Sequence, residues 1–163
     1  MESQLKFAAI DIGSNAVRLL FSGVFEEAHS ATFRKMSLIR MPIRLGDDAF
    51  TQKFISDGKV SQLVKSMIGF KHLIEAFQPL DYMACATSAM REAENGPEIC
   101  NRIFAETGIK VDIIDGVREA QFIFENKSAD LFGGNDAYLY VDIGGGSTDI
   151  TLFSRGRIIT TGS

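Results

Sequence analysis

Hydrophobic positions along the chain follow the period of strands in some segments and the period of helices in others. Residues 6–12 and 16–24 are apolar runs that predict two strands, and the polar turn at 13–15 between them predicts a hairpin. Residues 31–41 predict a third strand. Residues 42–50 carry turn-forming residues and predict a loop.

The period changes over residues 56–77, where apolar residues are spaced by three and four positions and predict an amphipathic helix. Ser56 or Asp57 stands where a helix cap is expected. The other predicted elements are a strand over 81–86, a short helix after Thr87-Ser88, a helix over 97–107, a strand over 110–115 and a helix over 117–131.

The end of the chain repeats its beginning. Residues 137–143 predict a strand that runs into Asp-Ile-Gly, as the first strand does, and further strands follow over 149–154 and 157–161. The order is therefore βββ-α-β-α-β-α followed by a second βββ. We expect residues 1–132 to form a first lobe and residues 137–163 to form the opening strands of an incomplete second lobe.

Composition and charge exclude several classes of protein. The net charge of −4 argues against a general nucleic-acid binder, which is usually basic. Two cysteines without a CxxC pattern predict neither a disulfide framework nor a zinc site. The N-terminus lacks the pattern of a signal peptide, and the apolar runs are too short for a membrane span, so we expect a cytoplasmic protein.

Each Asp-Ile-Gly turn has a possible chemical use. Glycine leaves backbone N–H groups accessible, successive N–H groups bind phosphate oxygens, and an Asp at the strand end binds a divalent cation. A plain hairpin turn also explains residues 13–15. Three consecutive glycines at 144–146 favour phosphate binding, because glycine costs conformational entropy that a plain turn does not require.

Four stretches of the chain carry a more specific signal, namely "AIDIGSNAVRLLF" (9–21), "ATSAMREAENG" (86–96), "IIDGVREAQFIF" (113–124) and "VDIGGGSTDITLF" (141–153). They resemble the exopolyphosphatase and guanosine pentaphosphate phosphohydrolase family, which is part of the actin, sugar-kinase and heat-shock-protein ATPase superfamily. A fifth stretch, "IRLGD" (43–47), is similar to that family more weakly.

The resemblance implies an α/β fold of the actin-like ATPase (ribonuclease H-like) type, with a mixed sheet, flanking helices and two lobes. It implies hydrolysis of the terminal phosphate of polyphosphate or guanosine pentaphosphate with Mg²⁺. The exposed edges of the strands in residues 137–163 favour pairing with another chain, so we expect a homodimer in the intact protein. The residues that the resemblance places in the site are Glu119 and Arg91 as catalytic residues, Gly13, Ser14, Asn15, Gly144, Gly145, Gly146, Ser147 and Thr148 as phosphate-binding residues, and Asp11, Asp142 and Asp149 as metal positions.

Residue chemistry by itself leaves alternatives open. The helix dipole alone also explains Glu119 in a first helical turn, and a surface ion pair also explains Arg91. Two positions depart from the family pattern, because Asp149 and Arg118 each stand where Glu is usual. A regulator that binds polyphosphate or an alarmone nucleotide, and an ATP-binding half of a kinase-like protein, remain alternatives. We expect this chain alone to have little activity.

Overall fold

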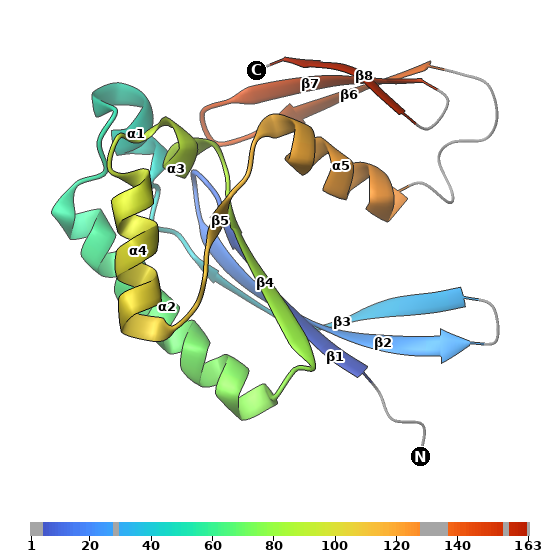
Figure 1. Ribbon diagram of the computed structural model, residues 1–163, viewed down its shortest axis with the longest axis horizontal. Helices are drawn as coiled ribbons and strands as arrows, with labels where there is room; N and C mark the ends of the chain where they lie inside the picture. The colour runs from blue at the N-terminus through green and yellow to red at the C-terminus, as the bar shows by residue number, and fades with distance from the viewer. Residues whose placement is uncertain (1–4, 28–29, 128–136, 155–156, 163) are drawn as a thin grey trace. The chain divides into compact units, whose positions relative to one another are not determined.

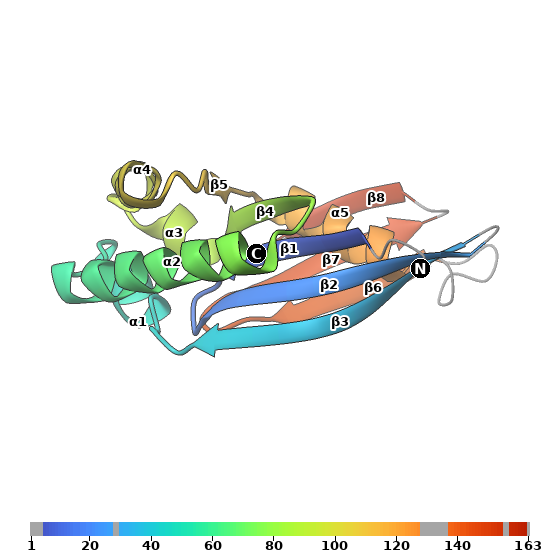
Figure 2. The ribbon, with the colours of Figure 1, turned by 90° about the horizontal axis from the view of Figure 1, so that it is seen from below.

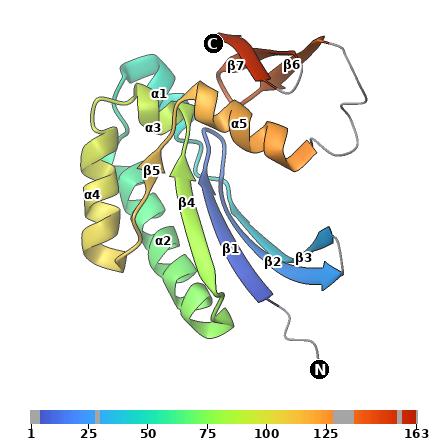
Figure 3. The same cartoon turned by 45° about the vertical axis from the view of Figure 1, so that its right-hand side comes forward.

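Five strands of the first 113 residues pair into a mixed sheet with the order β3-β2-β1-β4-β5 (Figure 3). The computed structural model describes residues 5–27, 30–127, 137–154 and 157–162. The first three strands form an antiparallel meander, whereas β4 pairs in parallel with β1 and β5 pairs in parallel with β4. The strands are β1 (Leu5–Ile12), β2 (Val17–Glu27), β3 (Ser30–Met41), β4 (Asp81–Ala86) and β5 (Asp112–Ile113).

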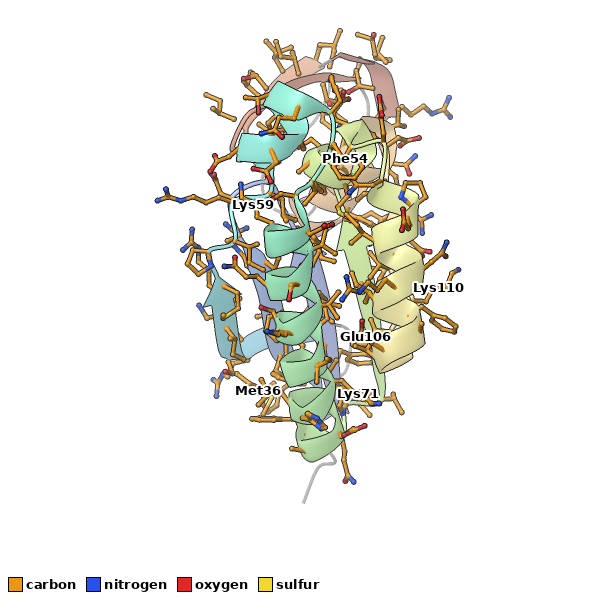
Figure 4. The ribbon with its side chains drawn as sticks, turned by 90° about the vertical axis from the view of Figure 1, so that its left-hand side faces the viewer. Met36, Phe54, Lys59, Lys71, Glu106 and Lys110 are labelled. Carbon is orange, nitrogen blue, oxygen red and sulfur yellow. The ribbon has the colours of Figure 1, made fainter. Side chains whose placement is uncertain are left out.

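Two long helices cover one face of this sheet. Figures 1 and 2 show α2 (Asp57–Phe77) running alongside the strands, and Figure 4 shows α2 and α4 (Gly96–Thr107) side by side in front of them. Two short helices, α1 (Gly46–Gln52) and α3 (Ser88–Glu92), follow β3 and β4. The core between sheet and helices is apolar and contains Ile10, Ile12, Leu19, Phe21, Leu63, Val64, Met67 and Ile103.

The alternation of side chains across the strands decides which residues remain for a site. Ile10 and Ile12 of β1 are buried beneath the helices. Asp11 lies between them in the chain, so its side chain points to the opposite face of the sheet, where it pairs across the ladder with Arg18. The polar chemistry of the first strand is therefore on the face of the sheet opposite α2 and α4.

Two predicted elements differ from the structure. Residues 42–50 were predicted as a loop, but α1 begins at Gly46 because Ala49 packs into the core; a helix of seven residues is too short to reveal its period. The strand predicted over 110–115 is limited to two residues, since β5 lies at the sheet edge and only two of its residues pair with β4.

The cap prediction for α2 is partly confirmed. Ser56 is the N-cap residue, but its side chain makes no cap hydrogen bond. Its hydroxyl instead donates to the carboxylate of Asp48 in α1. The residue thus ties two helices together rather than closing the end of one.

Residues 114–163 form a second compact unit. It contains α5 (Gly116–Lys127) and an antiparallel sheet with the order β6-β7-β8. Helix α5 contacts this sheet on the face that carries the buried side chains Thr151 and Phe153. The strands are β6 (Ala137–Ile143), β7 (Thr148–Ser154) and β8 (Arg157–Gly162).

The sequence assigned the helix over 117–131 to the first lobe, whereas contacts group α5 with the strands that follow it. The predicted linker at 133–136 lies outside the described residues. No helix in the described part of the chain is long and apolar enough to cross a membrane.

Candidate functional site

The first glycine turn connects β1 to β2. The N–H of Gly13 donates to the carbonyl of Ala16 at 3.1 Å, which closes the turn. Ser14 is buried, and its Oγ lies 2.9 Å from Oγ of Ser88 at the start of α3. The turn is therefore tied to α3, although the two segments are 74 residues apart in the chain.

Backbone hydrogen bonds turn the carbonyl groups of this loop toward a neighbouring segment. The carbonyl of Asn15 accepts from the N–H of Arg44 at 3.1 Å, and that of Ser14 accepts from the N–H of Gly46 at 2.9 Å. Within the described residues, the N–H groups of Ser14 and Asn15 make no hydrogen bond. Two adjacent donors thus remain available at the turn, which is the arrangement that binds phosphate oxygens.

Asp11 lies beside this loop and already has a cationic partner. Its Oδ2 is 3.1 Å from Nη1 of Arg18, and both side chains are about half exposed. A Cβ atom added at Gly13 would lie 3.8 and 3.9 Å from the two carboxylate oxygens of Asp11. The carboxylate is therefore next to the predicted phosphate loop, with its charge partly neutralised by Arg18.

Arg91 lies on the short helix that follows β4. Its N–H donates to the carbonyl of Thr87 at 3.0 Å. Arg91 and Ser88 are three residues apart in α3, so they share one face of that helix. Because Ser88 contacts Ser14, the structure places Arg91 on the side of α3 that faces the first loop.

The second glycine turn repeats the geometry of the first. The N–H of Gly144 donates to the carbonyl of Ser147 at 2.9 Å, as Gly13 does to Ala16. Gly145 and Gly146 follow within the exposed turn, and Thr148 is the first residue of β7. The two turns that the sequence predicted as copies therefore share the hydrogen bond that closes them.

The second unit places two aspartates opposite each other in its sheet and a glutamate on the helix that contacts this sheet. Asp142 and Asp149 are opposite each other in the β6–β7 ladder. A Cβ atom added at Gly116, in the first turn of α5, would lie 3.7 Å from Oδ1 of Asp149. Glu119 is one helical turn further along, on the same face of α5 as Gly116. The predicted catalytic carboxylate therefore lies on the face of α5 whose first residue, Gly116, adjoins Asp149.

The pKa of Tyr140 responds to its burial and to the negative charges of Asp142 and Glu119. Burial raises the pKa of its hydroxyl above the usual value, and the negative charges of Asp142 and Glu119 raise it further. Residue chemistry in the sequence did not point to Tyr140. The signal that was available is its position two residues before Asp142, on the same face of β6.

The start of α5 also fixes the side chain of Arg118. Asp115 accepts a hydrogen bond from the N–H of Arg118 at 2.8 Å and so caps the helix. The guanidinium of Arg118 lies 5.7 Å from the ring centre of Phe122, a cation–π contact along the helix. This departure from the family pattern therefore packs against α5 itself.

Solved structures define the class of protein to which this fold belongs. The crystal structure of the Aquifex aeolicus member of the Ppx/GppA family matches with a TM-score of 0.82 and 23% identity, over 97% of this chain and 50% of that chain. An exopolyphosphatase structure from Cytophaga hutchinsonii matches with a TM-score of 0.82 and 25% identity, over 96% and 49%. The fold is that of the actin-like ATPases, and the predicted fold class is confirmed.

One family within this class contains the chain. The model of the Ppx/GppA phosphatase family matches residues 24–163, so the chain belongs to that family and the resemblance found in its sequence is confirmed. The bifunctional 3-dehydroquinate synthase/phosphatase of Fusobacterium nucleatum is 32% identical over 89% of this chain and 22% of its own length. Exopolyphosphatase 1 of Mycobacterium leprae is 26% identical over 90% and 42%. The chain spans less than half the length of these curated relatives.

Proposed function

We propose that the protein containing this chain hydrolyses the terminal phosphate of a phosphoanhydride chain, with polyphosphate or guanosine pentaphosphate as substrate. Membership of the Ppx/GppA phosphatase family supports a hydrolysis reaction that releases phosphate. The observation that carries the proposal is the position of Glu119 on the same face of α5 as Gly116, which adjoins Asp149. A carboxylate near the second glycine turn is the group that such a reaction needs to position a water molecule.

The two glycine turns supply charge neutralisation in this proposal. Phosphoryl transfer depends on fixed donors that stabilise the charge on the phosphate oxygens. The N–H groups of Ser14 and Asn15 are such donors, because they have no partner within the described residues. Arg91 adds a positive charge on the face of α3 that carries Ser88.

Glu119 has the role of the general base or water-positioning residue. The backbone N–H of Glu119 donates to the carbonyl of Asp115 at 3.0 Å, so the residue is fixed in the first turn of α5. A carboxylate in that position accepts a proton from an attacking water and holds its oxygen toward the phosphorus.

Asp142 and Asp149 fit a magnesium ion. Within the described residues, no three side chains of the types His, Cys, Asp and Glu converge on one point. Mg²⁺ does not require such a cluster, because it binds through one or two carboxylates together with waters and substrate phosphates. Two like charges opposite each other in a ladder repel, and a cation offsets that repulsion. When bound there, Mg²⁺ supplies neutralisation of phosphate charge.

One observation favours a second function, a regulator that binds the phosphate chain without hydrolysing it. Asp149 replaces the usual Glu and is one methylene shorter, which reduces its reach by about 1.5 Å. A carboxylate that stops short of the ion holds it only through water. Binding would then persist while hydrolysis is lost.

The test is phosphate release by the longest natural protein that contains residues 1–163, with Mg²⁺ and long polyphosphate, guanosine pentaphosphate or ATP. Glu119→Gln is compared with Glu98→Gln, because both residues lie in the first turn of a helix and the two changes remove the same helix-dipole contribution. We expect Glu119→Gln to lower the rate at least a hundredfold and Glu98→Gln to leave it unchanged.

Phosphate release from polyphosphate or guanosine pentaphosphate that is lost in Glu119→Gln supports the hydrolase. The ratio of the two release rates then identifies the preferred substrate. Binding without release supports the regulator. Faster release from ATP than from the other two contradicts both and supports the kinase-like alternative. The 163-residue chain is measured in parallel, and activity equal to that of the longer protein contradicts the expectation that this chain alone has little activity.

A further inference from the structure

The backbone at Arg44 has a conformation that its sequence neighbours do not explain. Three residues other than glycine have positive φ in the described part of the chain: Arg44 (57°), Lys53 (55°) and Gln78 (49°). Lys53 and Gln78 end α1 and α2, where a left-handed residue is common. Arg44 precedes α1 and ends no helix. A strained residue without such a structural role indicates a functional one.

Hydrogen bonds on both sides hold Arg44 in this conformation. Its N–H donates to the carbonyl of Asn15 in the first glycine turn, and its own carbonyl accepts from Nζ of Lys59. Lys59 is held in turn by an ion pair of 2.8 Å with Asp48 (Figure 4 labels Lys59). The strain is thus maintained by a network that ends at the predicted phosphate loop.

The side chain of Arg44 is exposed and has no partner of its own. No hydrogen bond or ion pair of its guanidinium is found within the described residues. Other arginines of the chain are paired, for example Arg18 with Asp11 and Arg102 with Glu106. Arg44 thus places an unpaired guanidinium on a segment whose backbone bonds to the first glycine turn, and a guanidinium is a donor that suits phosphate oxygens.

We propose that Arg44 is a substrate-binding residue, whose guanidinium binds the phosphate next to the one held by the N–H groups of Ser14 and Asn15. The inference rests on the proposed function, because it assumes that the turn at 13–15 binds phosphate. The backbone N–H of Arg44 bonds to the carbonyl of Asn15, whereas its guanidinium is at the end of a long side chain, several bonds further from those N–H groups. A ligand with several linked phosphates therefore gains more from Arg44 than orthophosphate does.

The experiment measures binding of linear tripolyphosphate and of orthophosphate by calorimetry, with the same natural protein. Arg44→Asn removes the charge and keeps a residue that tolerates positive φ, and Arg44→Gly removes the side chain and the strain together. Gln78→Asn is the control for backbone conformation, and Lys110→Gln is the control for charge, since Lys110 is exposed on another part of the unit (Figure 4). The melting temperature of each variant verifies its fold.

We expect both Arg44 variants to bind tripolyphosphate about tenfold more weakly, with a smaller loss for orthophosphate and with melting temperatures close to that of the wild type. Both controls bind as the wild type does. Tripolyphosphate binding that is unchanged in Arg44→Gly, or equally weakened in Lys110→Gln, overturns the proposal, and so does a wild-type protein that binds no tripolyphosphate.

The two proposals fail separately. A protein that binds tripolyphosphate through Arg44 but releases no phosphate contradicts the hydrolase and supports this inference. A protein that releases phosphate with wild-type binding in both Arg44 variants contradicts this inference alone.

Discussion

A single carboxylate, Asp48, links the starts of the first two helices. Its Oδ2 accepts from the N–H of Ser56 at 3.0 Å, and its Oδ1 lies 2.8 Å from Nζ of Lys59. Only 12% of its side chain is exposed. The hydrogen bonds from Lys59 and Ser56 lower the pKa of Asp48 from 3.8 to about 2. The charged form of Asp48 therefore stabilises the fold.

The pKa gives the pH dependence of this contribution. A carboxylate whose pKa is lower in the folded state contributes all of its stability above the unfolded value of 3.8 and loses it as the pH falls to about 2. We expect Asp48→Asn to lower the free energy of unfolding by roughly 2 kcal/mol at pH 7 and by little at pH 2. Urea denaturation at pH 7, 4 and 2 measures this difference.

The neighbouring Asp47 is the control for that measurement. Its side chain is 64% exposed and lies 3.6 Å from the same Nζ of Lys59. An exposed ion pair contributes little, so Asp47→Asn is expected to cost less than about 1 kcal/mol at any pH. Equal losses of unfolding free energy in Asp48→Asn and Asp47→Asn at pH 7 would contradict this expectation. They would show that the net charge of the protein, and not the buried hydrogen bonds of Asp48, stabilises the fold.

At the scale of elements, α1 packs against the first glycine turn through a position that has no room for a side chain. A Cβ atom at Gly46 would lie 2.8 Å from a ring carbon of Phe50 and 3.0 Å from Cβ of Ser14. The close approach allows the hydrogen bond from Gly46 to the Ser14 carbonyl. The helix that the sequence did not predict is therefore a support of the predicted phosphate loop.

This packing predicts opposite effects for two glycines. Gly46→Ala forces Phe50 or the turn to move, and we expect it to destabilise the fold by about 1–3 kcal/mol and to weaken tripolyphosphate binding. Gly69→Ala, in the middle of α2 with nothing within 4 Å of its added Cβ, is expected to stabilise by about 0.5–1 kcal/mol. Thermal denaturation with and without tripolyphosphate tests both, and a Gly46→Ala protein as stable as the wild type would contradict the crowding.

For the whole molecule, comparison of the two meanders shows an uncovered apolar face. Alignment of the two Asp-Ile-Gly turns matches Ile10 with Val141 and Ile12 with Ile143. Ile10 is 2% exposed, whereas Val141 is 46% exposed. Ile12 is 0% exposed, whereas Ile143 is 78% exposed. The difference arises because α2 covers the first meander, whereas the outer face of the second carries no helix among the described residues.

An uncovered face of this kind promotes association. Leu139, Val141, Ile143 and Ile150 are exposed on neighbouring strands, and contiguous apolar surface of this type drives contacts between molecules. We expect the 163-residue chain to self-associate as its concentration rises, and Ile143→Lys with Val141→Thr to shift the equilibrium toward monomer. Sedimentation velocity measures the change.

Leu80→Lys is the matched control, because Leu80 is 68% exposed but belongs to the first unit. It is expected to leave the association unchanged. A chain that is monomeric at all concentrations, or one that responds equally to Leu80→Lys, would contradict association through the β6–β8 face.

Local sequence patterns were sufficient to predict most helices and strands. They also predicted the residues of each phosphate loop, but not the segments that support the loop. The bounds of β4 and α2 agree with prediction within a residue, because α2 has a long apolar period and polar residues flank both elements. Support for the first loop was not predictable: Ser88 and Gly46 contact Ser14 only because the fold brings α1 and α3 to the turn. The two catalytic residues and the metal positions remain predictions about the intact site.

The sequence by itself determined the repeated Asp-Ile-Gly turns, the order of the strands and of the helices other than α1, and the family, since these depend on residues that are near one another in the chain. Only the tertiary structure decided what those turns touch. The positive φ of Arg44 accompanies its bond to Asn15, and the contact of Ser14 with Ser88 joins residues 74 positions apart. The lowered pKa of Asp48 and the pairing of Asp142 with Asp149 depend on how successive elements meet. Such contacts depend on packing, and a local pattern does not encode packing partners.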